Sequence, residues 1–192
     1  AAGNCVVAKP SELSPTTAYL LGEICQEAGL PTGVLNIVHG LGLKTGEAIV
    51  RHPDIKAISF TGGTQTGKTI SSITGPMFKK TSLELGGKNP CLVFEDCDFD
   101  ETGSEVARLA FSNQGQICLC GSRILVQRSI YERFRDALVQ KAEKLRIGDP
   151  LDEHTQFGSL ISEAHLKKVM GYIDLARQEG GICLTGGEIF RP

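Results

Sequence analysis

Residues 57–69 read AISFTGGTQTGKT, and the fold class can be worked out from this segment and its surroundings. Ala57 to Phe60 is an apolar run typical of a buried strand, and Thr61-Gly62-Gly63-Thr64 is a turn. The residues from about Gln65 to Ile73 have the pattern of a helix. A buried strand that turns sharply into a helix is the repeating unit of a parallel sheet covered by helices.

The same alternation occurs twice before this segment. Residues 4–8 and 34–38 have strand patterns, and a helix follows Ser14-Pro15 and ends at Gly29. Ser14 can cap this helix, and Pro15 suits its first position. A glycine-rich turn and a short helix to about Arg51 follow the second strand. Three such units predict a parallel, doubly wound, Rossmann-like sheet, whose ligands bind beyond the carboxyl ends of the strands.

A domain boundary is predicted at Gly86-Gly87, which ends a strand pattern from Thr81 to Leu85. The predicted domains are residues 1–85 and residues 86–192. For the second domain we expect strands at residues 90–94, 124–127 and 182–184, and helices that lead to Phe111 and cover residues 130–145 and 162–178. The whole chain is therefore predicted to be of the α/β class.

Composition excludes several classes of function. The chain has 192 residues, of which 41% are hydrophobic and 22% charged, and its net charge is −2, so no overall field attracts nucleic acid or an anionic membrane. Its apolar runs are shorter than the ~20 residues of a membrane span, and no signal peptide is visible. Seven irregularly spaced cysteines argue against a disulfide framework and for a reducing, cytoplasmic location. The Cys118-x-Cys120 pair lacks the neighbouring ligands of a metal site.

The residues from Phe111 to Arg123, FSNQGQICLCGSR, are the candidate for the chemistry. Cys118 and Cys120 lie between Gly115 and Gly121, on an expected turn between a helix and a strand. A thiol on such a turn is a better nucleophile candidate than a thiol in a core. The other five cysteines fall in strand or helix patterns and are expected to be small core residues.

A second candidate is the glycine loop. Gly62 to Thr69 matches G-x-x-x-x-G-K-[ST], in which Lys68 would contact ATP phosphates and Thr69 would hold magnesium. Such a site also needs an acidic residue after an apolar strand, and Glu84 does not follow four apolar residues. The residues therefore indicate an anion site from Gly62 to Gly67 without specifying ATP. The alternative is a tight turn with a solvated Lys68.

Four motifs together resemble the aldehyde dehydrogenase superfamily. They are FSNQGQIC at residues 111–118, LELGGKNP at residues 83–90, FTGGT at residues 60–64 followed by Gly67, and KPSE at residues 9–12. They occur in the order of the family, and the similarity extends over essentially the whole chain, which looks like an internal fragment of a longer enzyme. By this resemblance, residues 1–85 are the C-terminal part of an NAD-binding domain and residues 86–192 the N-terminal part of a catalytic domain. The P-loop match is then a coincidence within a cofactor loop.

The resemblance implies a role for each matching residue. Cys118 would attack an aldehyde to form a thiohemiacetal, which loses hydride to NAD, and Glu84 would activate the water that hydrolyses the resulting thioester. Cys120 would be a packed neighbour. His165 either reaches the cofactor or lies on the surface. The residues implied in cofactor binding are Lys9, Glu12, Gly42, Gly46, Phe60, Gly62, Gly63, Thr64, Gly67 and Leu85.

Glu12 would accept hydrogen bonds from ribose hydroxyls and repel a 2′-phosphate, so we expect NAD rather than NADP. Residues 117–124 look most like the 2-aminomuconic or 2-hydroxymuconic semialdehyde branch, so the expected partner is a small aldehyde, and the full-length enzyme is expected to be a homo-oligomer. Gly63 stands where the family often has serine. The oxyanion asparagine and a second glutamate of the family lie outside residues 1–192, so the isolated chain is predicted to be inactive. The alternatives are a P-loop phosphohydrolase and a catalytically silent, crystallin-like structural protein.

Overall fold

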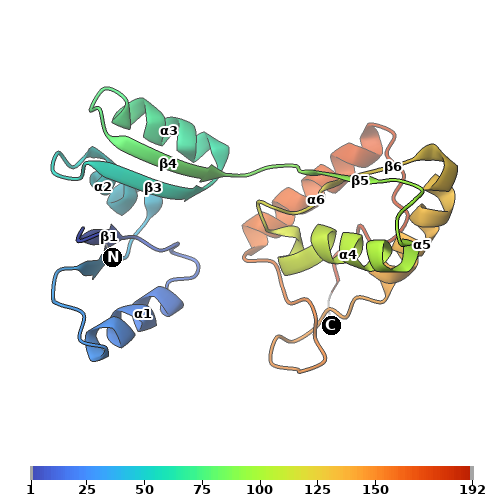
Figure 1. Ribbon diagram of the computed structural model, residues 1–192, viewed down its shortest axis with the longest axis horizontal. Coiled ribbons are helices and arrows are strands. Elements are labelled where there is room, and N and C mark those ends of the chain that lie inside the picture. Colours follow the sequence, from blue (N-terminus) through green and yellow to red (C-terminus); the bar gives the residue numbers. More distant parts are fainter. Residues whose placement is uncertain (1, 191–192) are drawn as a thin grey trace. The chain divides into compact units, whose positions relative to one another are not determined.

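The computed structural model describes residues 2–190. The chain divides into two compact units, Ala1–Leu85 (unit 1) and Gly86–Pro192 (unit 2), which can be told apart in Figure 1. The division falls at the residue where the sequence predicts a domain boundary. The assignment of the units to a cofactor domain and a catalytic domain stays a prediction.

Unit 1 alternates strands and helices as expected. Strand β1 pairs in parallel with β2, with Val6 opposite Leu35, and β3 pairs in parallel with β4, with Ala57 opposite Lys80. The predicted α/β class is thereby confirmed, with the strands arranged as two parallel pairs in this unit. In chain order the elements are β1 (Val6–Ala8), α1 (Thr16–Glu27), β2 (Leu35–Ile37), the π-helix η1 (Gly42–Gly46), α2 (Glu47–Arg51), β3 (Ala57–Gly62), α3 (Thr64–Thr74) and β4 (Lys80–Leu85).

The core of unit 1 lies between β3 and the two helices on either side of it in sequence. Val50 of α2, Ile58 of β3 and Ile70 of α3 are buried against one another. Phe60 and Leu83 pack on this cluster from the two strands. The segment AISFTGGTQTGKT therefore supplies β3, with its buried Ile58, and the first half of α3, whose buried Ile70 follows directly after the segment.

The predicted cap of α1 is wrong, whereas its predicted end is right. Pro15 occupies the N-cap position, and the N–H of Ser14 donates to the carbonyl of Ser11 instead of Ser14 capping the helix. After α1, Gly29 adopts φ +79°, and the N–H of Leu30 returns to the carbonyl of Cys25. This is the left-handed helix stop that glycine makes easily.

Unit 2 is built on one parallel pair, β5 and β6, with Pro90 opposite Arg123 and Val93 opposite Val126. Asp98 caps α4 and Ser162 caps α6, each accepting a hydrogen bond from a backbone N–H of the first turn. The elements are β5 (Pro90–Val93), α4 (Phe99–Phe111), the 3₁₀ turn η2 (Ser112–Gly115), β6 (Arg123–Val126), the 3₁₀ turn η3 (Arg128–Ile130), α5 (Tyr131–Glu143) and α6 (Glu163–Gln178).

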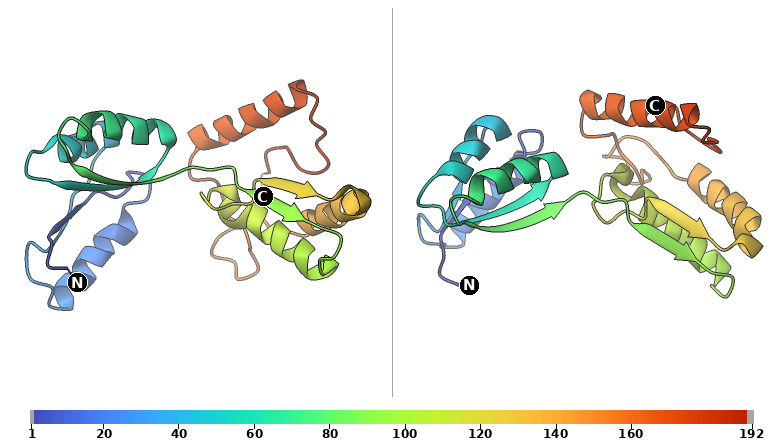
Figure 2. Two further views of the ribbon diagram at one scale, coloured as in Figure 1. Left: turned by 45° about the horizontal axis from the view of Figure 1, so that its top comes forward. Right: turned by 90° about the horizontal axis from the view of Figure 1, so that it is seen from above.

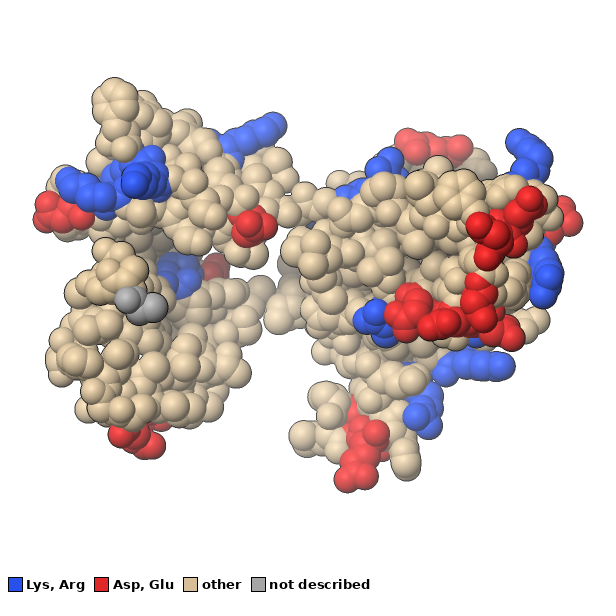
Figure 3. All heavy atoms as spheres, viewed as in Figure 1, with Lys and Arg blue, Asp and Glu red and all other residues tan. Residues whose placement is uncertain are grey.

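The core of unit 2 lies between this strand pair and helices α4 and α5, which can be followed in both views of Figure 2. Val93, Val106 and Phe134 are almost fully buried, and the ring of Phe134 meets that of Phe99 edge-on at 5.6 Å. Acidic side chains gather over α4 (red in Figure 3), including Asp100 and Glu101 of its first turn. Their charges suit the positive end of the helix.

The predicted strand at residues 182–184 is wrong. Within residues 2–190, this segment belongs to no strand, and Ile182 is 85% exposed. Three apolar residues favour a strand only when a neighbouring strand supplies hydrogen-bond partners. The Cys183 sulfur instead lies 3.4 Å from the carbonyl oxygen of Thr185.

Candidate active site

Cys118 lies on a tight turn between α4 and β6. The N–H of Cys120 donates to the carbonyl of Ile117 at 3.2 Å, so residues 117–120 form a β-turn, here called the cysteine turn. Cys118 and Leu119 occupy its two central positions and are exposed. Within the described residues, neither of their N–H groups donates to an acceptor. The thiol of Cys118 therefore stands beside backbone donors that are free for a ligand.

The second cysteine of the turn is held by α4. Cys120 is only 3% exposed, and its sulfur lies 3.9 Å from the carbonyl oxygen of Ser112. The N–H of the next residue, Gly121, donates to the carbonyl of Leu109. A Cβ atom at Gly121 would lie 2.7 Å from a methyl carbon of Leu109. These contacts show that Cys120 is a packed neighbour, so Cys118 is the accessible thiol of the cysteine turn.

Asn89 holds the cysteine turn on the side of the strands. Its side-chain Nδ2 donates to the carbonyl oxygen of Cys118 at 2.7 Å and to that of Cys120 at 3.3 Å. The backbone carbonyl of Asn89 accepts from the N–H of Arg123, just before β5 and β6 begin to pair. Sequence analysis gave Asn89 no role, because the contact joins residues 29 and 31 positions apart.

The chain reaches the cysteine turn through three left-handed residues. Asn113, Gln114 and Gly115 have φ values of 49°, 55° and 72°. Only Gly115 adopts this conformation without a steric cost, whereas the other two store backbone strain that the surrounding structure must offset. Such strain is common beside reactive groups.

The glycine loop does not have the geometry of a P-loop. Helix α3 begins at Thr64 with Gly63 as its N-cap residue, so Lys68 and Thr69 lie inside the helix. The N–H of Gly67 donates to the carbonyl of Gly63, and the hydroxyl of Thr69 donates to that of Gln65. In a phosphate cradle, the backbone N–H groups of the loop are free and point toward the phosphate. The P-loop alternative is therefore wrong, because the helix starts too early.

Two of the predicted cofactor glycines are explained by packing within unit 1. A Cβ atom at Gly62 would lie 2.5 Å from the ring of Phe60, and one at Gly67 would lie 2.7 Å from a methyl carbon of Leu85. Gly63 has open space around it and precedes the N-terminus of α3. Gly63 and Thr64 thus form the part of the loop that an anion can approach, because a helix N-terminus presents free N–H groups and a partial positive charge.

Glu84 lies near the end of β4, exposed and opposite Thr61 of β3. Unit 1 thus brings Glu84 and Leu85 to the same end of the strand pair as Gly62. Because Glu84 belongs to unit 1 and Cys118 to unit 2, their cooperation stays a prediction.

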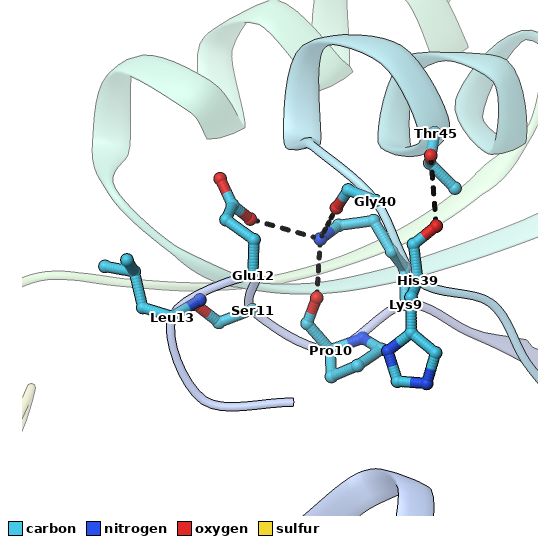
Figure 4. A network of polar contacts seen from close by, with 8 residues as sticks. All are labelled: Lys9, Pro10, Ser11, Glu12, Leu13, His39, Gly40 and Thr45. Atoms are coloured by element: carbon cyan, nitrogen blue, oxygen red, sulfur yellow. Dashed lines mark hydrogen bonds and ion pairs between the residues drawn. The ribbon is translucent and has the colours of Figure 1, made fainter. Parts of the chain in front are cut away.

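Lys9 and Glu12 meet beyond the carboxyl ends of β1 and β2, as drawn in Figure 4. The Lys9 ammonium donates to the carbonyls of Gly40, at 2.9 Å, and of Pro10, and lies 3.4 Å from a Glu12 carboxylate oxygen. A hydrogen bond from its own backbone and the one from Lys9 hold the pKa of Glu12 below its ordinary value. Glu12 therefore stays an anion, able to accept hydrogen bonds from hydroxyl groups.

A pocket of about 440 Å³ opens beside this pair. Gly46 packs along the Lys9 side chain, and Gly42 at the other end of η1 has open space around it. The pocket combines apolar surface with a carboxylate, which fits a nucleoside. Sequence analysis missed the contributions of Tyr19 and His39, since nothing in their local pattern marks them. The residues that line the pocket are Pro10, Ser11, Glu12, Pro15, Thr16, Tyr19, His39 and Gly40.

Other predicted features have simpler outcomes. His165 is half-buried in the first turn of α6, where its N–H donates to the Ser162 cap.

All seven cysteines are free thiols, and Cys5 and Cys183 are exposed, so the expectation that both are core residues is wrong. Among residues 2–190, no three His, Cys, Asp or Glu side chains are grouped to hold a metal ion. No helix of this part of the chain has the length and apolarity to cross a membrane.

Comparisons with known proteins agree with the motifs. The 2-aminomuconic semialdehyde dehydrogenase of Bos taurus is 50% identical over 186 residues, which are 97% of this chain and 38% of that protein. The crystal structure of HpcC from Thermus thermophilus superposes with a TM-score of 0.95 at 44% identity, covering 97% of this chain and 36% of that one. Betaine aldehyde dehydrogenase from Staphylococcus aureus in complex with NAD⁺ gives a TM-score of 0.95 at 37% identity, over 98% of this chain and 37% of that one.

The chain thus spans less than two fifths of the length of these relatives. The model of the aldehyde dehydrogenase family matches all of residues 1–192. The fold and the resemblance expected from the sequence are thereby confirmed, and the chain belongs to the aldehyde dehydrogenase family.

Proposed function

We propose that the protein carrying this chain oxidises a small aldehyde, a semialdehyde of the muconate type, to the carboxylic acid with NAD. The observation that carries the proposal is the cysteine turn, where an exposed Cys118 thiol stands beside free backbone N–H groups. The substrate class is proposed because the chain is 50% identical to a 2-aminomuconic semialdehyde dehydrogenase over 186 residues.

Cys118 is the proposed nucleophile. Its thiolate attacks the aldehyde carbon, and the oxygen becomes an anion that the N–H of Cys118 can stabilise, because this N–H donates to no acceptor within residues 2–190. The product is a thiohemiacetal on the Cys118 sulfur. A nicotinamide held beside this carbon would supply the redox chemistry as the hydride acceptor, and the carbon bonded to the Cys118 sulfur would then be that of a thioester.

Glu84 is the proposed general base. Its exposed carboxylate takes a proton from the water that attacks the thioester, and the acid then leaves with Cys118 restored as thiolate.

We assign residues 1–85 to the cofactor domain and residues 86–192 to the catalytic domain. A homo-oligomer in the cytoplasm stays a prediction.

The proposed cofactor site has two parts in unit 1. Lys9 and Glu12, with Gly42 and Gly46, hold the adenosine ribose beside the pocket of about 440 Å³. The N-terminus of α3, with Gly63 and Thr64, holds the pyrophosphate, and Phe60, Gly62, Gly67 and Leu85 shape that loop. The anionic Glu12 favours NAD over NADP, since a 2′-phosphate would be repelled there.

The test compares Cys118→Ser with Cys120→Ser in the full-length protein. We expect Cys118→Ser to lower kcat for NAD-dependent aldehyde oxidation by about 10³-fold or more, as loss of a nucleophile does in other covalent enzymes. Cys120→Ser should keep most of the activity, because its thiol is buried and lies against the carbonyl of Ser112. NADH absorbance with semialdehyde and simple aliphatic substrates measures both.

Thiol reactivity provides the control. Iodoacetamide should modify Cys118 faster than the other six cysteines, which peptide mass spectrometry can follow. A Cys118 that reacts no faster than its neighbours, in a protein without turnover, would contradict the proposal and favour a structural role on the same scaffold.

A further inference from the structure

We propose that Asn89 is a positioning residue for Cys118, an inference that rests on the proposed function. The side-chain amide of Asn89 holds two backbone carbonyls of the cysteine turn at once, those of Cys118 and Cys120. No other side chain of residues 2–190 donates to either carbonyl except the hydroxyl of Ser122, which lies 3.2 Å from that of Cys120.

The two bonds use the full donor capacity of the amide. An Asn NH₂ group has two N–H donors, and one is directed to each carbonyl, at 2.7 Å and 3.3 Å. The backbone of Asn89 is held by Arg123. The carbonyl of Asn89 accepts from the N–H of Arg123, and the guanidinium of Arg123 donates to the carbonyl of the preceding residue, Lys88. The donor is therefore anchored to the strand pair before it reaches the turn.

The bond to the Cys118 carbonyl acts on the residue that bears the thiol. A peptide group is planar, so a fixed carbonyl fixes the plane between Cys118 and Leu119 and the ψ angle of Cys118. Cys120 and Gly121 hold only the far end of the turn, through α4. Without Asn89, the two central residues of the turn would make no hydrogen bond within residues 2–190, and the turn would be closed only by the bond from the N–H of Cys120 to the carbonyl of Ile117. Asn89 thus fixes the direction in which the sulfur and its adjacent N–H point.

The test compares Asn89→Ala with Asn36→Ala in the full-length protein. Asn36 is a matched control in unit 1, because its amide also donates to two backbone carbonyls, those of Val6 and Gly33. We expect Asn89→Ala to lower kcat by about 10- to 100-fold, since small displacements of a reacting group have such effects. The KM for the aldehyde and the Kd for NAD should stay near those of the parent. Asn36→Ala should keep the parent kcat.

A second variant adds a pH signature that simple destabilisation would not produce. In Asn89→Asp, a carboxylate would face two carbonyl oxygens, which raises its pKa and disrupts the turn while it is ionised. When it is protonated, its O–H can donate to one carbonyl again. The ratio of variant to parent kcat should therefore rise as pH falls toward the raised pKa of this carboxyl, whereas the ratio for Asn89→Ala should stay constant.

Alkylation separates this inference from the proposed function. If the parent oxidises no aldehyde, the proposed function fails, and the rate of Cys118 modification by iodoacetamide still decides the role of Asn89. We expect this rate to fall severalfold in Asn89→Ala and to stay unchanged in Asn36→Ala. Parent-like alkylation and kcat in Asn89→Ala, or an equal loss in both variants, would overturn the inference. Should Asn89→Ala not fold, a pH-independent ratio for Asn89→Asp would overturn it.

Discussion

Glu12 is the residue on which we expect coenzyme choice to depend. Its carboxylate stands at the mouth of the proposed adenosine pocket, held as an anion by its own backbone and by Lys9. In Glu12→Gln, we expect kcat/KM with NAD to fall about tenfold, the effect of losing one charged hydrogen bond. The value with NADP should fall less or rise, because the repulsion of a 2′-phosphate is removed. Steady-state kinetics with both coenzymes measure this ratio.

The same residue has a predictable effect of pH on stability. Its pKa is lowered in the folded chain, so its stabilising contribution is complete above the ordinary value of 4.5 and is lost as pH falls through the lower, folded value. The acid limb of stability should therefore be shallower in Glu12→Gln. Glu105→Gln is the control for coenzyme choice. Glu105 also has a lowered pKa, caused by Arg108, but it lies in unit 2, outside the proposed adenosine pocket. An equal loss of NAD preference in Glu105→Gln would contradict the assignment.

At this scale, contiguous motifs could be predicted and contacts across the fold could not. Cys118, Glu84, Lys9 and Glu12 each lie in a short motif whose chemistry is local. Asn89 acts on residues 29 and 31 positions away, and this contact follows from the pairing of β5 with β6. The sequence also left Cys118 and Cys120 chemically equivalent apart from the family motif, and burial distinguishes them.

At the scale of elements, the helix caps provide a matched pair of predictions. Ser162 caps α6 by accepting from the N–H of His165, whereas Ser14 makes no cap for α1. Ser162→Ala should therefore lower the free energy of unfolding of unit 2 by about 1 kcal/mol. Ser14→Ala should change stability little. Urea denaturation followed by circular dichroism measures both, and equal losses would contradict the two cap assignments.

Two helical glycines provide a second comparison. Gly67 of α3 is buried against Leu85, whereas a Cβ atom added at Gly171 of α6 would meet no other part of residues 2–190 within 4 Å. Gly67→Ala should lower the free energy of unfolding by about 1 kcal/mol or more, because a methyl group overpacks the helix against β4. Gly171→Ala should raise it by about 0.5–1 kcal/mol, since alanine has the higher helix propensity. Opposite signs in thermal or urea denaturation are the expected result.

The elements that could be predicted are those whose pattern is long or ends in a clear stop. Helix α6 was placed to within a residue because Ser162 and the glycines after it mark both ends. The strand expected at residues 182–184 was wrong because three apolar residues do not specify a partner. The start of α1 was wrong because Pro15 itself adopts the cap position. Both errors concern neighbours in space or backbone geometry that composition does not encode.

At the scale of the whole chain, each unit leaves one apolar face open. Leu92 and Leu125 are opposite each other on β5 and β6 and are 62% and 51% exposed, while Val93 on the other face is 2% exposed. In unit 1, α1 has no buried residue, and Leu21 and Ile24 on it are 50% and 58% exposed. Apolar faces of this kind are usually covered in a functional protein. They indicate that further polypeptide covers these apolar faces when residues 1–192 function.

We therefore expect residues 1–192, produced alone, to oxidise aldehydes at a rate near the detection limit. Glu84 and Cys118 belong to different units, and the chain spans 38% of the relative with which it shares 50% identity. Catalysis needs both groups held in one fixed geometry, which is the main source of rate enhancement in such a site. The measurements are NADH production and ester hydrolysis, with iodoacetamide labelling of Cys118 to show that the cysteine turn is formed. Turnover equal to that of the full-length protein would contradict this expectation and show that the two units suffice.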